Sequence, residues 1–286
     1  MKYTVDGELK DLKVIKEYIK VKGQDKPLEY EIKMTHRGPL MDLNLLQGAE
    51  VLFSEGLPAK NDGSVYSFQW SGAINEEGTT RVLRDFIRAT SFKDIDRMVN
   101  SMKVFNSVPQ NLIVAFQNGD IGFYLANNIP IRKDGKPYTG CRVLDGTTTA
   151  TDWIGYVKPS DLPRVINPKK GFIVTANNRQ MPDNVHLDHG ATITSTIRAQ
   201  RITELIQKGI NAGHKFDYKD MLTIQNDTVD LMARDITPLI TKIVHQMIPV
   251  LSPIEGEQAQ DLIGRLATWY GDMGENSVGA TVFSTW

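Results

Sequence analysis

The order of two hydrophobic patterns along the chain constrains its fold more than any other feature. Residues 1–75 alternate apolar and polar positions, as strands with one buried face do, whereas residues 194–270 repeat apolar residues at helical spacing. Between them the patterns predict a helix pair at 79–103, a hairpin at 111–126 and a strand at 171–178. Because strands and helices are grouped instead of alternating, the chain is predicted to be an α+β protein and not a doubly wound parallel sheet.

Local signals predict where several elements begin. Ser91 is a natural helix N-cap, and Asp94 lies at the capping-box position, so a helix is expected to start there. The residues expected to face the core from this helix are Ile95, Met98 and Val99. An Asn-Gly dipeptide between two alternating apolar runs is a strong hairpin signal at 111–126. Residues 65–73, rich in aromatic and β-branched side chains, predict a further strand.

Charge and cysteine usage exclude several classes of protein. The chain has 33 Lys and Arg residues against 34 Asp and Glu, which favours neither a nucleic-acid partner nor an anionic membrane surface. Its single cysteine, Cys141, excludes an intrachain disulfide and suits a structural thiol better than a nucleophile, because no histidine partner is evident. No apolar run approaches the about 18 residues of a membrane span. The first residues do not resemble a signal peptide, and no compartment is predicted.

One short polar segment could bind a cation. It contains Asp183, His186, Asp188 and His189, and imidazole with carboxylate suits zinc or iron. The segment offers no third ligand at a typical spacing, so a polar surface loop is the favoured interpretation. A hard cation such as calcium makes smaller demands, since one carboxylate can contribute to its shell.

Two asparagines and two arginines could have chemical roles. Asn177 and Asn178 close the predicted strand, where asparagine is disfavoured, so they are either turn residues or amide donors held by the sheet. Arg198 and Arg201 open a predicted helix, and Arg201 has Glu204 three residues on, as in an ordinary surface ion pair. These residues alone establish no function.

Six segments together resemble the penicillin acylase family of N-terminal nucleophile hydrolases. They are THRGP at 35–39, NLIVAFQNGDIGFYLANNIPIR at 111–132, DWIGYVKPSDLP at 152–163, NPKKGFIVTANNR at 167–179, RAQRITELI at 198–206 and IQNDTVDLMA at 224–233. The resemblance runs from about Tyr3 to the end and implies part of an αββα sandwich. Residues 1–193 would form its sheet-rich part and residues 194–286 a largely helical part, with no separate linker.

The resemblance also implies a reaction. In this family a serine that opens the large chain attacks an acyl amide, its own α-amine acts as the base, and no cofactor is required. Substrates include side-chain amides of β-lactam antibiotics, acyl-homoserine lactones and other N-acyl compounds. The sequence contains no Ser-Asn-x-Trp segment of the kind that carries this serine. The chain is therefore expected to be an internal piece of the large chain, inactive alone and partnered by the small chain and nucleophile-bearing segment of its precursor.

Two residues match the family's catalytic support by position. Asn177 matches the oxyanion-hole asparagine, whose amide N–H stabilises the charge on the tetrahedral intermediate. Arg201 matches an arginine near the nucleophile's amine and that asparagine, with Arg198 as the weaker alternative. Asp188 matches a calcium-ligand aspartate, so the resemblance implies a structural calcium ion to which the Pro130 or Pro137 carbonyl would contribute. The alternative function is a non-catalytic remnant or interaction module on the same scaffold.

Overall fold

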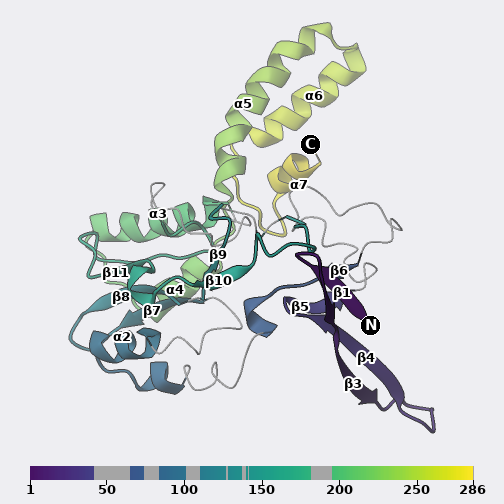
Figure 1. The fold of residues 1–286 in the computed structure, drawn as a ribbon. Coiled ribbons are helices and arrows are strands. Elements are labelled where there is room, and N and C mark those ends of the chain that lie inside the picture. Colours follow the sequence, from purple (N-terminus) through teal and green to yellow (C-terminus); the bar gives the residue numbers. More distant parts are fainter. Residues whose placement is uncertain are drawn as a thin grey trace. The chain divides into compact units, whose positions relative to one another are not determined.

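The computed structural model describes residues 1–41, 65–73, 84–100, 110–126, 128–136, 140, 142–181 and 195–285 (Figure 1). The chain divides into two compact units. The first comprises Met1–Ile173 with Gln180–Thr192, and the second comprises Val174–Arg179 with Ile193–Trp286. The short segment that carries Asn177 therefore belongs to the unit that contains the long helices.

Small antiparallel sheets make up the described part of the first unit. Their orders are β1-β2, β3-β4-β5-β6, β11-β8-β7 and β10-β9. The strands are β1 (Lys2–Val5), β2 (Glu8–Asp11), β3 (Lys13–Ile19), β4 (Leu28–Thr35), β5 (Gly38–Met41), β6 (Tyr66–Ser67), β7 (Gln110–Ala115), β8 (Ile121–Ala126), β9 (Pro130–Arg132), β10 (Trp153–Tyr156) and β11 (Arg164–Ile166).

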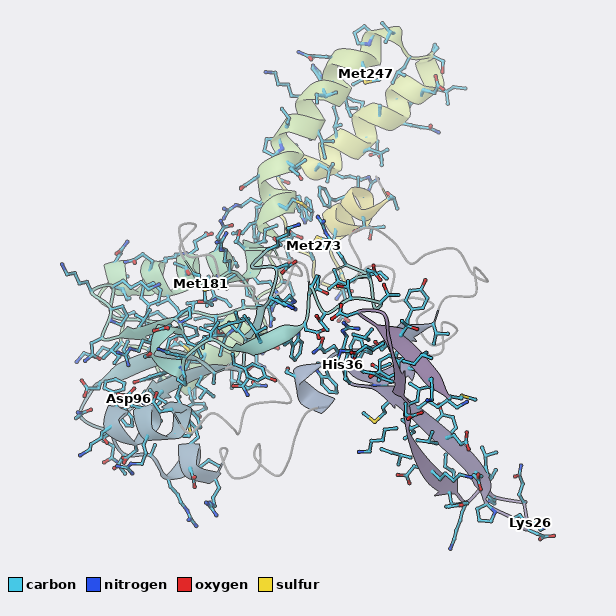
Figure 2. The ribbon with its side chains drawn as sticks, in the orientation of Figure 1. Lys26, His36, Asp96, Met181, Met247 and Met273 are labelled. Carbon is cyan, nitrogen blue, oxygen red and sulfur yellow. The ribbon has the colours of Figure 1, made fainter. Side chains whose placement is uncertain are left out.

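The pairing of β3 with β4 follows the alternation in the sequence. Ile15 lies opposite Ile32, whereas Lys16, on the other face, lies opposite Glu31. Lys16 Nζ also reaches Glu29 Oε1 at 2.6 Å. Side chains alternate between the two faces of a strand, so the Ile15–Ile32 pair lies on one face of this ribbon and the ion pairs of Lys16 lie on the other. Lys26 lies at the far end of the ribbon, in the turn between the two strands (Figure 2).

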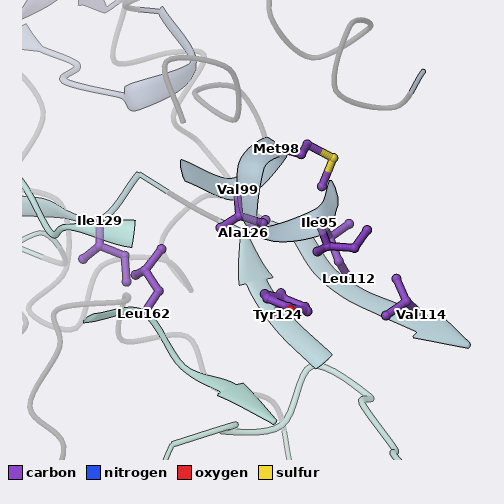
Figure 3. Close-up of a cluster of buried hydrophobic side chains, with 9 residues drawn as sticks. All are labelled: Ile95, Met98, Val99, Leu112, Val114, Tyr124, Ala126, Ile129 and Leu162. Atoms are coloured by element: carbon purple, nitrogen blue, oxygen red, sulfur yellow. The ribbon is translucent and has the colours of Figure 1, made fainter. Parts of the chain in front are cut away.

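Helix α2 (Phe92–Asn100) packs on β7 and β8 to form the core of the first unit (Figure 3). Ser91 Oγ donates to Asp94 Oδ2 at 2.9 Å, so the predicted helix start is confirmed. The three residues predicted to face inward are all buried: Ile95, Met98 and Val99. They pack with Leu112, Val114, Tyr124, Ala126, Ile129 and Leu162. The predicted hairpin is also confirmed, with Gly119 at φ +91° in its turn.

Of two further predicted strands, one is much shorter than expected and the other is absent. Within 65–73 only Tyr66–Ser67 pairs, with β5, and Ser71–Ala73 form a 3-10 turn. Residues 171–178 form no strand, although their composition favours one. A strand exists only where a neighbour completes its ladder, and no described strand pairs with this segment. Its backbone instead takes positive φ at Gly171 (+76°) and Asn177 (+60°).

The second unit is mostly helical, and the helical spacing predicted for residues 194–270 is confirmed. Its helices are α3 (Ile197–Asn211), α4 (Tyr218–Gln225), α5 (Leu231–Met247), α6 (Pro253–Leu266) and α7 (Val278–Ser284). Capping boxes at Asp217 and Ser252 fix the starts of α4 and α6, and Asp230 caps α5. Helices α5 and α6 run side by side as a hairpin, with Met247 near its end (Figures 1 and 2). Within the described residues, none of the helices combines the length and apolar character that crossing a membrane requires.

Tyr124 supports a first prediction, about stability. Its side chain is 2 % exposed, and its hydroxyl lies near the Asp96 carboxylate but makes no well-aligned hydrogen bond among the described residues. Burial, together with the nearby Asp96 carboxylate, raises the pKa of Tyr124 to about 12. Because an unsatisfied buried hydroxyl is costly, Tyr124→Phe is expected to leave the free energy of unfolding unchanged or raise it by up to about 1 kcal/mol. Urea denaturation measures this, with the exposed Tyr156→Phe as control. A loss of about 1 kcal/mol would instead show that the hydroxyl is hydrogen-bonded.

Candidate active site

Asn177 lies in a loop whose conformation is unusual for a residue with a side chain. Its φ of +60° lies in the left-handed region, which asparagine tolerates better than most residues. Asn178 stabilises the same loop, since its Oδ1 accepts from the Ala176 N–H (3.1 Å) and its Nδ2 donates to the Arg179 carbonyl (3.2 Å). The exposed Asn177 side chain is directed by a different contact.

That contact is with Arg198, in the first turn of α3. Arg198 Nη2 donates to Asn177 Oδ1 at 2.9 Å and to the Ala176 carbonyl at 2.9 Å. A guanidinium only donates hydrogen bonds, so the amide atom facing it must be the oxygen. The Nδ2 donor of Asn177 is thereby presented on the side away from Arg198. An arginine that fixes an amide in this way orients a hydrogen-bond donor.

Arg201, one turn further along α3, binds carboxylates instead. Its Nε and Nη2 donate to the two oxygens of Asp227 at 2.8 and 2.7 Å, and its Nη1 donates to Glu204 at 3.1 Å. This forked pair lowers the pKa of Asp227 and raises that of Arg201. The contact with Glu204 is the ion pair expected from spacing. Asp227 lies 26 residues away and was missed by sequence reasoning, although it belongs to the family-like segment 224–233.

The structure thus brings Asn177 together with Arg198, the alternative arginine, and places Arg201 in a carboxylate pair on the same helix. The role predicted for Arg201 stays a prediction. Its guanidinium has five N–H donors, and the Asp227 and Glu204 contacts account for three of them. The described residues thus leave two of its donors for a further acceptor.

The predicted calcium site falls largely outside the described residues. Asp188 and Pro137 are not among them, nor are Cys141 and the two histidines near Asp188. Pro130 opens β9. In the part of the chain that the structure describes, no three His, Cys, Asp or Glu side chains are arranged to hold a metal ion. The calcium ion stays a prediction, and the reaction proposed below does not depend on it.

Comparison of the fold with solved structures indicates the class of protein. The chain resembles the solved structure of thermostable penicillin G acylase from Alcaligenes faecalis, with a TM-score of 0.66 and 18% sequence identity. The likeness covers 95% of this chain and 43% of that one. It confirms the predicted α+β fold. The family model named Penicillin amidase matches residues 1–286, and the chain belongs to that family.

Curated relatives extend this likeness. An acyl-homoserine lactone acylase, QuiP, from Pseudomonas aeruginosa is 26% identical over 98% of this chain. The penicillin acylase 2 proenzyme of Pseudomonas sp. strain SE83 is 26% identical over 90% of it. The matches cover 32% and 29% of those proteins. The chain therefore spans about a third of the length of these relatives.

Proposed function

We propose that the chain is part of an amidohydrolase that cleaves linear acyl amides through a serine acyl-enzyme. The observation that carries the proposal is the hydrogen bond from Arg198 Nη2 to Asn177 Oδ1, which turns the amide N–H of Asn177 outward. This N–H is held pointing outward, in a loop of the family-like segment 167–179, and is therefore suited to donate to an oxyanion. Membership of the penicillin amidase family supports the same reaction.

The proposed chemistry assigns separate tasks to residues of this chain. As the serine attacks, the carbonyl oxygen becomes negative, and Asn177 Nδ2 donates to it. The donor contributes most to rate when it needs no reorientation during the reaction, and Arg198 supplies that restraint. Arg201 lies one helical turn away, where Asp227 and Glu204 offset its charge, and its remaining N–H donors serve to orient a polar group beside the nucleophile. The nucleophile comes from a segment for which these 286 residues contain no match, since no Ser-Asn-x-Trp sequence occurs in them.

The substrate class follows from the relatives. One is named for acyl-homoserine lactones and another for penicillin, and both compound classes carry an acyl group on an amide nitrogen. We propose N-acyl compounds of this kind as substrates. The partners proposed are the small chain and the nucleophile-bearing segment of the same precursor.

The test compares two proteins with the same substrates. One is the purified 286-residue chain, and the other is the same chain fused to the small chain and nucleophile-bearing segment of a homologue. Phenylacetyl amides and N-acyl-homoserine lactones are supplied, and the released amine is measured. The fusion is expected to turn over at least one class, and the 286-residue chain neither.

The control is a fusion whose nucleophilic serine is replaced by alanine, in which turnover should vanish. A folded, processed fusion that hydrolyses neither class would overturn the proposal and favour a non-catalytic module. Turnover by the 286-residue chain alone would show that the nucleophile lies within it, which contradicts the proposed division of roles.

A further inference from the structure

The segment IQNDTVDLMA resembles the family but has no role in the reaction proposed above. Its Asp227 binds both an arginine side chain and a backbone N–H. Oδ1 accepts from Arg201 Nε at 2.8 Å and from the Val229 N–H at 3.2 Å, and Oδ2 accepts from Arg201 Nη2 at 2.7 Å. The backbone contact fixes the plane of the carboxylate, and the carboxylate in turn fixes the guanidinium. Forked pairs of this kind are more directional than single ion pairs.

The pair lies where solvent weakens it little. The side chains of Arg201 and Asp227 are 18% and 19% exposed. Glu204, which also accepts from Arg201, is held in turn by Arg234 Nη1 from α5 at 3.0 and 3.1 Å. Three parts of the second unit are therefore tied together at Arg201: helix α3, the connection between α4 and α5, and helix α5. The network leaves Arg201 little rotational freedom.

The start of α3 has few other restraints. Its N-cap residue, Thr196, makes no side-chain capping hydrogen bond, and among the described residues Ser195 Oγ accepts from the Ile197 N–H. Uncapped first turns fray readily. Arg198 lies in this turn and Arg201 in the next. The forked pair of Arg201 with Asp227 is therefore the described side-chain contact that anchors α3 nearest to the hydrogen bond between Arg198 and Asn177.

We propose that Asp227 is a positioning residue that fixes the Arg201 guanidinium and, through the first turns of α3, keeps Arg198 bound to Asn177. This assigns a task to the segment 224–233, and its catalytic consequence rests on the proposed function. Asp227 does not touch the reacting atoms. It acts by limiting the conformations open to two arginines.

The structural test uses the 286-residue chain with ¹⁵N-labelled arginine and asparagine. In Asp227→Asn, the Arg201 Nε–H is expected to exchange with solvent about tenfold faster, as loss of a charge-assisted hydrogen bond implies. The side-chain amide signals of Asn177 should move as Arg198 loses its place. The matched control is Asp261→Asn on α6, which removes the same charge from an exposed pair with Arg265 (2.8 Å). It should leave the Asn177 signals unchanged.

Unchanged Asn177 amide signals in a folded Asp227→Asn variant would overturn the proposal and leave Asp227 a purely structural partner of Arg201. If that variant does not fold, Arg201→Lys serves instead, because lysine keeps the charge but cannot form the fork. In the active fusion, Asp227→Asn should lower kcat about tenfold with little change in KM, and should add nothing to Arg201→Lys. A fusion without turnover contradicts the proposed function alone, since the amide signals still decide the role of Asp227.

Discussion

Asn177→Gly is expected to lower the turnover of an acyl amide by about 10²–10³-fold, or roughly 2.7–4 kcal/mol of transition-state stabilisation. The loss follows from removing the only amide donor that Arg198 turns outward in the described loop. Glycine is the informative replacement, because the φ of +60° at this position costs glycine nothing. The measurement is kcat and KM of the nucleophile-bearing fusion, and the loss should fall on kcat.

Neighbouring variants separate chemistry from loop stability. Asn177→Ala should lose the same activity and in addition about 1–2 kcal/mol of stability, since alanine disfavours the left-handed conformation. Asn178→Ala should affect turnover much less, because the Asn178 amide is bound to the loop's own backbone. Equal losses at both positions, or a larger loss at Asn178, would show that the oxyanion donor has been assigned to the wrong residue.

The helices could be predicted because the information that specifies them is local. The capping interactions at Ser91, Asp217 and Ser252 each involve residues three positions apart, and the apolar faces repeat every turn. Such patterns remain visible without knowledge of any distant residue. The burial of Ile95 follows from them directly.

The segment 171–178 shows where that reasoning fails. Its apolar composition fits a buried strand, but strand formation depends on a partner that can come from any part of the sequence. The observed left-handed conformation of Asn177 ends any regular extension there. The sequence identifies this asparagine through its family-like setting, whereas its loop geometry requires the structure.

The choice between the two arginines could not be made from sequence either. Arg198 and Arg201 are three residues apart on one helix, so both lie on nearly the same face. The contacts that distinguish them come from Asn177, 21 residues before Arg198, and Asp227, 26 residues after Arg201. Spacing predicts the local Glu204 pair and nothing beyond it.

A second large effect is expected at Gly38, in the segment THRGP. Gly38→Ala should lower the free energy of unfolding by about 3 kcal/mol, which is large for one added methyl group. Gly38 has φ +147°, a conformation that residues with side chains rarely adopt, and a Cβ there would overlap the Phe68 carbonyl oxygen. The backbone of Phe68 is itself bound to β5, because its N–H donates to the Pro39 carbonyl at 2.9 Å. It cannot move without breaking that contact.

Gly23→Ala provides the matched control for this prediction. Gly23 also has positive φ (+86°), but nothing lies within 4 Å of where its Cβ would be. Its replacement should cost only the conformational penalty of about 1–2 kcal/mol. Urea denaturation measures the free energy of unfolding of both variants. The difference between their two losses is the steric cost at Gly38. Equal losses would mean that the Phe68 backbone yields to the methyl group, and the glycine of THRGP would then be required by its φ alone. A larger loss at Gly38 would show that it is required by the close approach of β5 to Phe68.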